Sequence, residues 1–204
     1  MHLSLNLVGL VLAVGLSACS SFTPPSRSTR GEIVLPRAPA SVAMRDWQVV
    51  GIRVTVPETL KISEANSYYP VADIVWRGDP PGDRRAQIAD LLRGALAEGT
   101  RQMQGSRPVV LDVTVTRFHS LTEKTRYTFG GNHSIRYTLS VADAETGAVL
   151  HGPQRVDASL DALGGQRAIE AEARGETQKV RITRHVAALT RASLDAPARL
   201  ATAR

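Results

Sequence analysis

Four segments of this chain alternate apolar and polar residues over the length of a β-strand, as strands that bury one face do. In the clearest of them, Val109, Leu111, Val113 and Val115 form the apolar set. A compact turn over residues 143–147 joins the last two segments, so these two should form a hairpin. The alternation therefore predicts a sheet with one buried face. The four segments are residues 46–57, 109–118, 134–142 and 148–158.

The first segment places Val50, Ile52, Val54 and Val56 on one face, which we expect to be the buried one. Pro57 has no N–H to give to a sheet and ends the segment. Farther along the chain, residues 71–76 are compatible with another short strand.

Apolar residues that recur at spacings of three and four predict two helices. Asp83 is the expected N-cap of the first helix. The second is expected to be one long helix from about Gln166 to Ala192, with Gly175 weakening its middle by about 1 kcal/mol relative to alanine. The buried stripe of the first helix should consist of Ile88, Leu91, Leu92, Ala95, Leu96, Gly99 and Met103.

The order of strand, helix, strand, hairpin and helix favours an α+β fold. A mixed or antiparallel sheet of about four to five strands, with two helices packed on one face, buries both apolar stripes at once. The chain of 204 residues is long enough for one ordinary domain, which we place at residues 46–196, followed by a loose tail at 197–204. Because aromatic residues make up only 4% of the chain, aliphatic side chains must build its core.

An apolar run from Leu7 to Leu16 lies near the N-terminus. It is far shorter than the roughly 20 residues that a membrane-spanning helix needs, but its length is typical of a signal peptide. Cys19 follows closely and is the only cysteine of the chain. A single cysteine excludes an intrachain disulfide and a cysteine-based metal cage.

The tetrapeptide Leu16-Ser17-Ala18-Cys19 resembles the lipobox of bacterial lipoproteins. The resemblance implies that residues 1–18 are a signal peptide cleaved between Ala18 and Cys19. Cys19 would then carry a thioether-linked diacylglycerol and an amide-linked acyl chain such as palmitate, with no other cofactor. Ser20 after the cysteine implies attachment to the outer membrane, facing the periplasm. The alternative is a buried N-terminal helix with an ordinary free cysteine.

Residues 19–45 contain four prolines and several serines without a sustained period, as a linker does. Four arginines and one glutamate give this tether a net charge of +3, half of the +6 of the whole chain. Two roles for the arginines stay open. They are attracted to an anionic membrane surface, or they only keep a solvated tether extended.

The first helix, the strand over 109–118 and the turn at 143–147 together resemble the auxiliary lipoproteins of ABC-type lipid transporters, over residues 48–158. The resemblance implies a non-catalytic adaptor in an envelope transport or assembly complex. The expected partners are the membrane, through the lipid anchor, and an envelope protein complex, but no nucleic acid. The alternative is a binding module for lipid, lipopolysaccharide or cell wall, whose anions match the basic charge of the chain.

The search for catalytic groups finds no Gly-x-Ser-x-Gly, Ser-x-x-Lys, Walker or His-Glu-x-x-His motif, so we expect no enzymatic activity and no catalytic residue. His119 and His133 flank the connection between two strands and could approach each other. Since no closely spaced further ligand accompanies them, we expect no metal site.

The most suggestive polar-aromatic segment contains Tyr127 and Phe129 just before Gly130-Gly131. In an extended chain the i,i+2 spacing puts both rings on one side, where they would form a contact surface for a partner. The alternative is that both rings close the core and the two glycines form a hairpin turn. The pair Tyr68-Tyr69 leaves the same two interpretations open.

Overall fold

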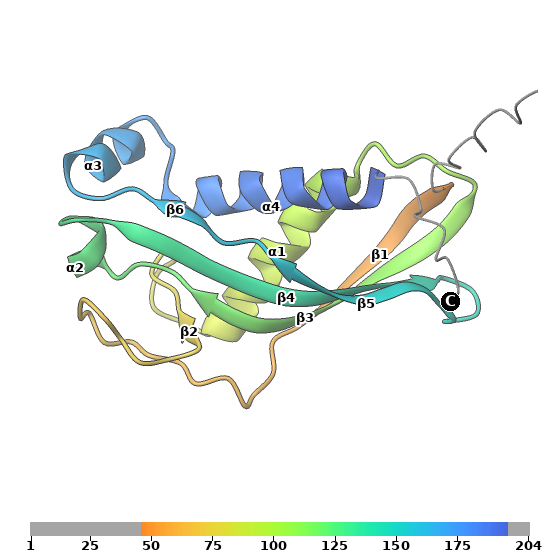
Figure 1. Ribbon diagram of the computed structural model, residues 1–204, viewed down its shortest axis with the longest axis horizontal. Coiled ribbons are helices and arrows are strands. Elements are labelled where there is room, and N and C mark those ends of the chain that lie inside the picture. The colour runs from red at the N-terminus through yellow and green to blue at the C-terminus, as the bar shows by residue number, and fades with distance from the viewer. Residues whose placement is uncertain (1–45, 196–204) are drawn as a thin grey trace, which may run out of the picture. The chain divides into compact units, whose positions relative to one another are not determined.

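The computed structural model describes residues 46–195, which form six strands and four helices (Figure 1). The expected signal peptide, the lipid attachment site Cys19, the tether and the tail at 197–204 lie outside the described residues. Within residues 46–195, no helix combines the length and the apolar character that crossing a membrane requires. The elements are β1 (Trp47–Thr55), β2 (Ile74–Val75), α1 (Arg84–Thr100), β3 (Arg107–His119), α2 (Glu123–Arg126), β4 (Gly131–Asp143), β5 (Val149–Asp157), β6 (Leu160–Ala162), α3 (Gln166–Ala173) and α4 (Gln178–Asp195).

The sheet is mixed, and its main strands lie in the order β1-β3-β4-β5. β1 and β3 are parallel, whereas β3 with β4 and β4 with β5 are antiparallel. Two short strands extend one end of this sheet, since β2 pairs with the end of β3 and β6 with the start of β4. The α+β prediction is confirmed. The short strand expected within residues 71–76 is β2, and the strand count exceeds four to five by β6, whose three residues are too short to show alternation.

Helices α1 and α4 cover one face of the sheet, and the core lies between the two layers (Figure 1). The predicted stripe of α1 is buried from Ile88 to Gly99, with Met103 partly buried beyond the end of the helix. Asp83 caps α1 as expected, because its Oδ1 accepts hydrogen bonds from the N–H groups of Arg85 at 2.9 Å and Ala86 at 3.1 Å. The sheet side of the core contains Val109, Leu111, Val113, Val115, Ile135, Tyr137, Leu139 and Val141.

The expectation that Val50 faces the core is wrong. A β-bulge between Val49 and Gly51 shifts the register of β1 against β3. As a result Val49 packs against the core with Ile52 and Val54, while Val50 is 56% exposed. Strict alternation cannot reveal the extra residue that a bulge inserts.

The single long helix expected over residues 166–192 is two helices, α3 and α4, separated by a turn. Gly175 has φ +79°, and its N–H and that of Glu176 return to carbonyls in the last turn of α3. Thr177 then opens α4, because its hydroxyl accepts a hydrogen bond from the N–H of Val180. Gly175 therefore ends a helix rather than weakening the middle of one.

Candidate functional site

The loop over residues 66–73, which leads into β2, is tied by hydrogen bonds along the end of β3 and along α2. Its backbone carbonyls accept from buried or half-buried side chains, and its side chain at Asn66 accepts from the backbone of α2. Because the loop is held at so many points, its backbone is already ordered. Little conformational entropy is therefore lost when the exposed side chains of the loop contact a partner. The bonds are Lys124 N to Asn66 Oδ1 (2.9 Å), Thr122 Oγ1 to Ser67 O (2.9 Å), Thr125 Oγ1 to Tyr68 O (3.0 Å), His119 Nε2 to Pro70 O (3.0 Å), Arg117 Nη1 to Ala72 O (3.4 Å) and Phe118 N to Asp73 O (3.0 Å).

This loop brings Tyr68 and Tyr69 against Phe129, and we call these three rings the aromatic cluster. The ring of Phe129 stacks on Tyr68 with centroids 5.4 Å apart and on Tyr69 with centroids 6.3 Å apart. The cluster is nevertheless open to solvent, since Tyr69 is 81% and Phe129 56% exposed. Neighbouring Val71 is almost fully exposed. Exposed apolar groups gathered on one fixed surface are typical of an interaction site.

A hollow of about 520 Å³ lies beside the aromatic cluster. Besides the three rings, its described lining includes Arg117, His119 and Asn132, and no described lining residue carries a carboxylate. Lys124 adds a further cation nearby, with its Nζ 4.5 Å from the centroid of the Tyr68 ring. The volume falls within the range of about 300–1,000 Å³ that is usual for ligand sites. We call this space the aromatic hollow.

The two residues expected to share a contact surface, Tyr127 and Phe129, face different neighbours. The segment after α2 is a turn and not an extended strand, so the i,i+2 spacing does not put both rings on one side. Tyr127 is 44% exposed; Arg126 lies over its ring and its hydroxyl donates to Glu172 Oε2 at 3.1 Å. Neither ring belongs to the buried core, and only Phe129 joins Tyr68 in the aromatic cluster.

The two glycines after Phe129 do not form a hairpin turn, because α2 lies in the connection between β3 and β4. Gly130 has φ +77° and packs on another chain segment, so that a Cβ there would lie 2.7 Å from the carbonyl oxygen of Ala162 and from the N of Gly164. Gly130 also lines the aromatic hollow, so this close approach forms part of its wall.

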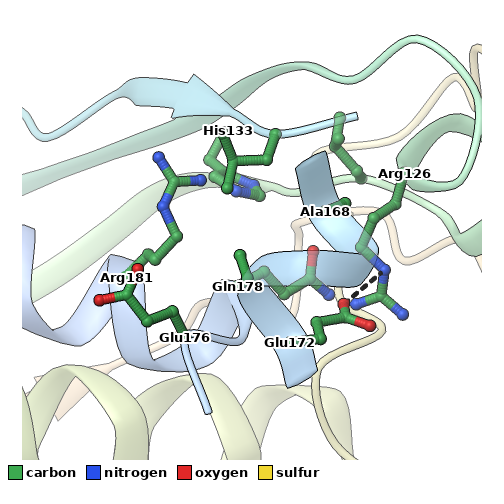
Figure 2. Close-up of a pocket in the computed structure, with 10 residues that line it drawn as sticks. Arg126, His133, Ala168, Glu172, Glu176, Gln178 and Arg181 are labelled. Atoms are coloured by element: carbon green, nitrogen blue, oxygen red, sulfur yellow. Dashed lines mark ion pairs between the residues drawn. The ribbon is translucent and has the colours of Figure 1, made fainter. Parts of the chain in front are cut away.

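A second group of polar side chains lies inside the fold, where α2, α3 and the start of α4 meet β4 (Figure 2). Ser120 Oγ lies 2.8 Å from His133 Nδ1. In the orientation that satisfies all its neighbours, the Gln178 amide donates to Ser120 Oγ and accepts from Arg126 Nη1, both at 3.1 Å. Arg126 in turn pairs with Glu172 at 3.2 Å. The cluster is a continuous network that joins α4 to β4.

His133 is the most strongly perturbed group of this network. Burial, together with the smaller effects of the cationic side chains of Arg181 and Arg126, lowers its pKa from 6.5 to about 3. His133 is therefore neutral and accepts the hydrogen bond of Ser120 at Nδ1. The pocket at this point measures about 10 Å³, room for about one water molecule, so it is not a ligand site.

His119 and His133 do not converge, although the sequence allows it. His119 Nε2 donates to Pro70 O, whereas His133 is turned into the interior towards Ser120. Among residues 46–195, no three or more His, Cys, Asp or Glu side chains are grouped to hold a metal ion.

The sequence of this domain matches a known protein family. A family model matches residues 47–204, a range that begins at the first residue of β1 and includes every helix and strand described above. The chain belongs to this family. It is DUF6778, a family of unknown function.

Individual proteins add little to this assignment. No curated protein matches the chain. A solved structure of a "putative lipoprotein" from Caulobacter crescentus CB15 is similar to it with 19% sequence identity and a TM-score of 0.35, over 71% of this chain and 87% of that one.

Proposed function

We propose that this member of DUF6778 is a lipid-anchored envelope lipoprotein, held at the outer membrane through Cys19 and facing the periplasm. Its folded domain would be a non-catalytic adaptor in an envelope transport or assembly complex. The anchor is supported by the apolar run that closes on Leu16-Ser17-Ala18-Cys19, where the only cysteine of the chain lies. Two covalent lipid groups on one residue would make the attachment stable, since a single acyl chain gives only marginal membrane binding.

The observation that carries the adaptor role is the aromatic cluster. Burying large aromatic side chains is a main source of folding stability, yet Tyr69 and Phe129 stay in solvent. The hydrogen bonds from Thr122, Thr125 and His119 hold the loop backbone on both sides of Tyr69 and so fix where this ring is presented. Rigid, exposed aromatic residues are frequent among the side chains that contribute most to binding.

A non-catalytic role is supported by the placement of the one described hydroxyl–imidazole pair that resembles a nucleophile and its base. Ser120 and His133 are each only 1% exposed, and the pocket beside them has no room for a substrate. A general base also needs a pKa near the working pH, whereas that of His133 is lowered to about 3.

The adaptor role can be tested by crosslinking in intact cells, followed by purification of the full-length protein from membranes. We expect a defined set of envelope proteins with the wild type, and its loss when Tyr69 and Phe129 are both changed to Ser. Tyr127→Ser is the matched control, because this ring is similarly exposed but lies outside the aromatic cluster. Recovery of the same proteins with the double variant would contradict the proposal.

A second candidate function is a binding module for lipid, lipopolysaccharide or cell wall. The observation that favours it is the charge of the aromatic hollow, where Arg117 in the lining and Lys124 beside it have no described carboxylate among the lining residues to neutralise them. Such a site suits a neutral or anionic ligand of small cross-section.

A further inference from the structure

We propose that the aromatic hollow binds the glycan of the cell wall, a chain of N-acetylated amino sugars whose attached peptide stems carry carboxylates. This inference rests on the proposed use of the aromatic cluster as a contact site and names the class of its ligand. Three features of the hollow support it: the exposed ring faces, the free polar groups at their side and the sign of the charge.

The ring faces match the shape and polarity of sugars. A pyranose presents a flat face of C–H groups, and the negative face of an aromatic ring attracts such polarised hydrogens. Tyr69 offers a ring that is 81% exposed, and its plane lies at only 29° to that of Phe129. Tyr68 continues the same stack on Phe129 with an interplanar angle of 28°. The three rings therefore form a stack rather than a flat sheet, and the highly exposed Tyr69 provides the platform on which a sugar ring can lie.

Polar groups beside this platform can meet the hydroxyl and acetamido groups at the edge of a sugar. The Asn132 side chain is exposed, lines the hollow and makes no side-chain hydrogen bond with the described residues. Arg117 gives one of its five N–H groups to Ala72 O and keeps the others for a ligand. By contrast, the hydroxyls of Thr122 and Thr125 are already used to hold the loop.

The charge of the hollow distinguishes a carboxylate glycan from a phosphorylated lipid. A phosphate carries about 1.5 to 2 negative charges at neutral pH, and proteins usually meet it with several convergent cations. The described lining holds a single arginine, with His119 engaged by Pro70 O and Lys124 placed over the Tyr68 ring. This modest positive charge suits one carboxylate at a time. The cell-wall glycan is therefore the better match than lipopolysaccharide.

The test is sedimentation of the full-length, lipidated protein in detergent micelles with purified cell-wall sacculi. We expect the wild type to sediment with the sacculi, and Tyr69→Ala and Phe129→Ala each to weaken binding by about threefold to tenfold, the value of one aromatic stacking contact. Tyr127→Ala is the matched control and should bind as the wild type does. Thermal melting of every variant shows that the domain stays folded, which the exposure of these rings favours.

A second arm separates the sources of an anionic sugar. Vesicles of phosphatidylethanolamine with and without lipopolysaccharide replace the sacculi, and we expect no ring-dependent binding to either. The inference would be overturned if the wild type did not sediment with sacculi, or if Tyr127→Ala lost as much binding as Phe129→Ala. Ring-dependent binding to lipopolysaccharide in place of sacculi would overturn it as well.

These outcomes also separate this inference from the adaptor role. If sacculi fail to bind but the crosslinked envelope proteins are lost in the Tyr69→Ser, Phe129→Ser double variant, only the glycan inference fails. If the ring substitutions change neither readout, the aromatic cluster is not a contact site and both proposals fail.

Discussion

Ser120 Oγ lies 2.8 Å from Nδ1 of His133, and both side chains are shielded from solvent. Because Gln178 donates to the same hydroxyl, the hydrogen of Ser120 is free to be donated to Nδ1 of a neutral imidazole. A protonated His133 would lose this bond and would lie near the cations Arg126 and Arg181. The network is therefore complete only with a neutral imidazole.

This arrangement predicts a stability that depends on pH. The pKa of His133 is about 3 in the folded protein and about 6.5 in the unfolded chain, so between these values only the unfolded state takes up the proton. We expect neutral His133 to make its full contribution to the free energy of unfolding above about pH 6.5. This contribution should be lost as the pH falls from about 6.5 to about 3. The loss should amount to several kcal/mol, at about 1.4 kcal/mol per pKa unit. Urea unfolding of the wild type and of His133→Gln across this range measures it.

The comparison with His133→Gln removes the effect of carboxylates that also lose stability in acid. Asp143 is one of these carboxylates, since hydrogen bonds from Thr146 and Arg107 hold its pKa at about 2. The substitution at His133 leaves these hydrogen bonds in place. If the free energy of unfolding of the wild type falls with decreasing pH no more steeply than that of His133→Gln, then His133 is protonated in the folded state.

Two glycines of α1 should respond to alanine with opposite signs. A Cβ at Gly99 would lie 2.6 Å from the carbonyl oxygen of Ala187 and 2.9 Å from Cβ of Thr190, so Gly99→Ala forces α1 and α4 apart and should cost about 1–3 kcal/mol. At Gly94 no atom outside the helix's own nearby backbone lies within 4 Å of the added methyl group, and Gly94→Ala should stabilise the helix by about 0.5–1 kcal/mol. Chemical unfolding measures both. Similar changes at the two positions would contradict the close packing of the helices.

The buried face of α1 gives a third prediction. Leu96 is fully buried, so Leu96→Asp places an unpaired charge in the core and should cost several kcal/mol, enough to unfold a domain of ordinary stability. Arg93 is exposed and, among residues 46–195, forms an ion pair only with Asp90 on the same helix, so Arg93→Asp should change stability by less than about 1 kcal/mol. Equal melting temperatures for the two variants would exclude this orientation of the helix.

Patterns of apolar residues that extend over a whole helix or strand predicted the fold well. The errors in the sequence prediction came from the local backbone geometry of single residues. The stripe on α1 and the alternation along β3 extend over several turns or residues, so one irregular position does not hide them. The bulge at Val49–Gly51 and the break at Gly175 each depend on the backbone angles of one or two residues. When a glycine lies within a run of helical apolar spacing, the sequence alone does not show whether the helix continues through it or ends there.

The candidate site was predictable only in part, because it joins segments far apart in the chain. Phe129 stands out beside its two glycines, but its ring contacts come from Tyr68 and Tyr69, about 60 residues earlier. What places them there is a series of carbonyl contacts from Thr122, Thr125 and neighbouring side chains, and backbone carbonyls leave no trace in a sequence.

The anchor lies outside the described residues, and its prediction rests on the sequence alone. Cys19→Ser removes the sulfur that would carry the diacylglycerol, so metabolic labelling with a fatty-acid analogue should lose its signal. The mature wild type should begin at Cys19 and lack residues 1–18, which mass spectrometry of the purified protein checks. A wild type that takes up no label, or that keeps its first 18 residues, would exclude a lipid anchor at this position.

The turn between α3 and α4 provides a prediction in which two interpretations of the same residue have opposite signs. In one continuous helix, Gly175→Ala would stabilise the protein by about 1 kcal/mol, as we expect for Gly94→Ala in α1. At φ +79°, alanine instead meets its own carbonyl oxygen and should cost about 1–2 kcal/mol, although no other atom lies within 4 Å of the added methyl group. Because the site is open, crowding by neighbours cannot account for such a loss. Urea unfolding of the two alanine variants side by side decides the matter, since stabilisation at both positions would mean that the helix runs through residue 175.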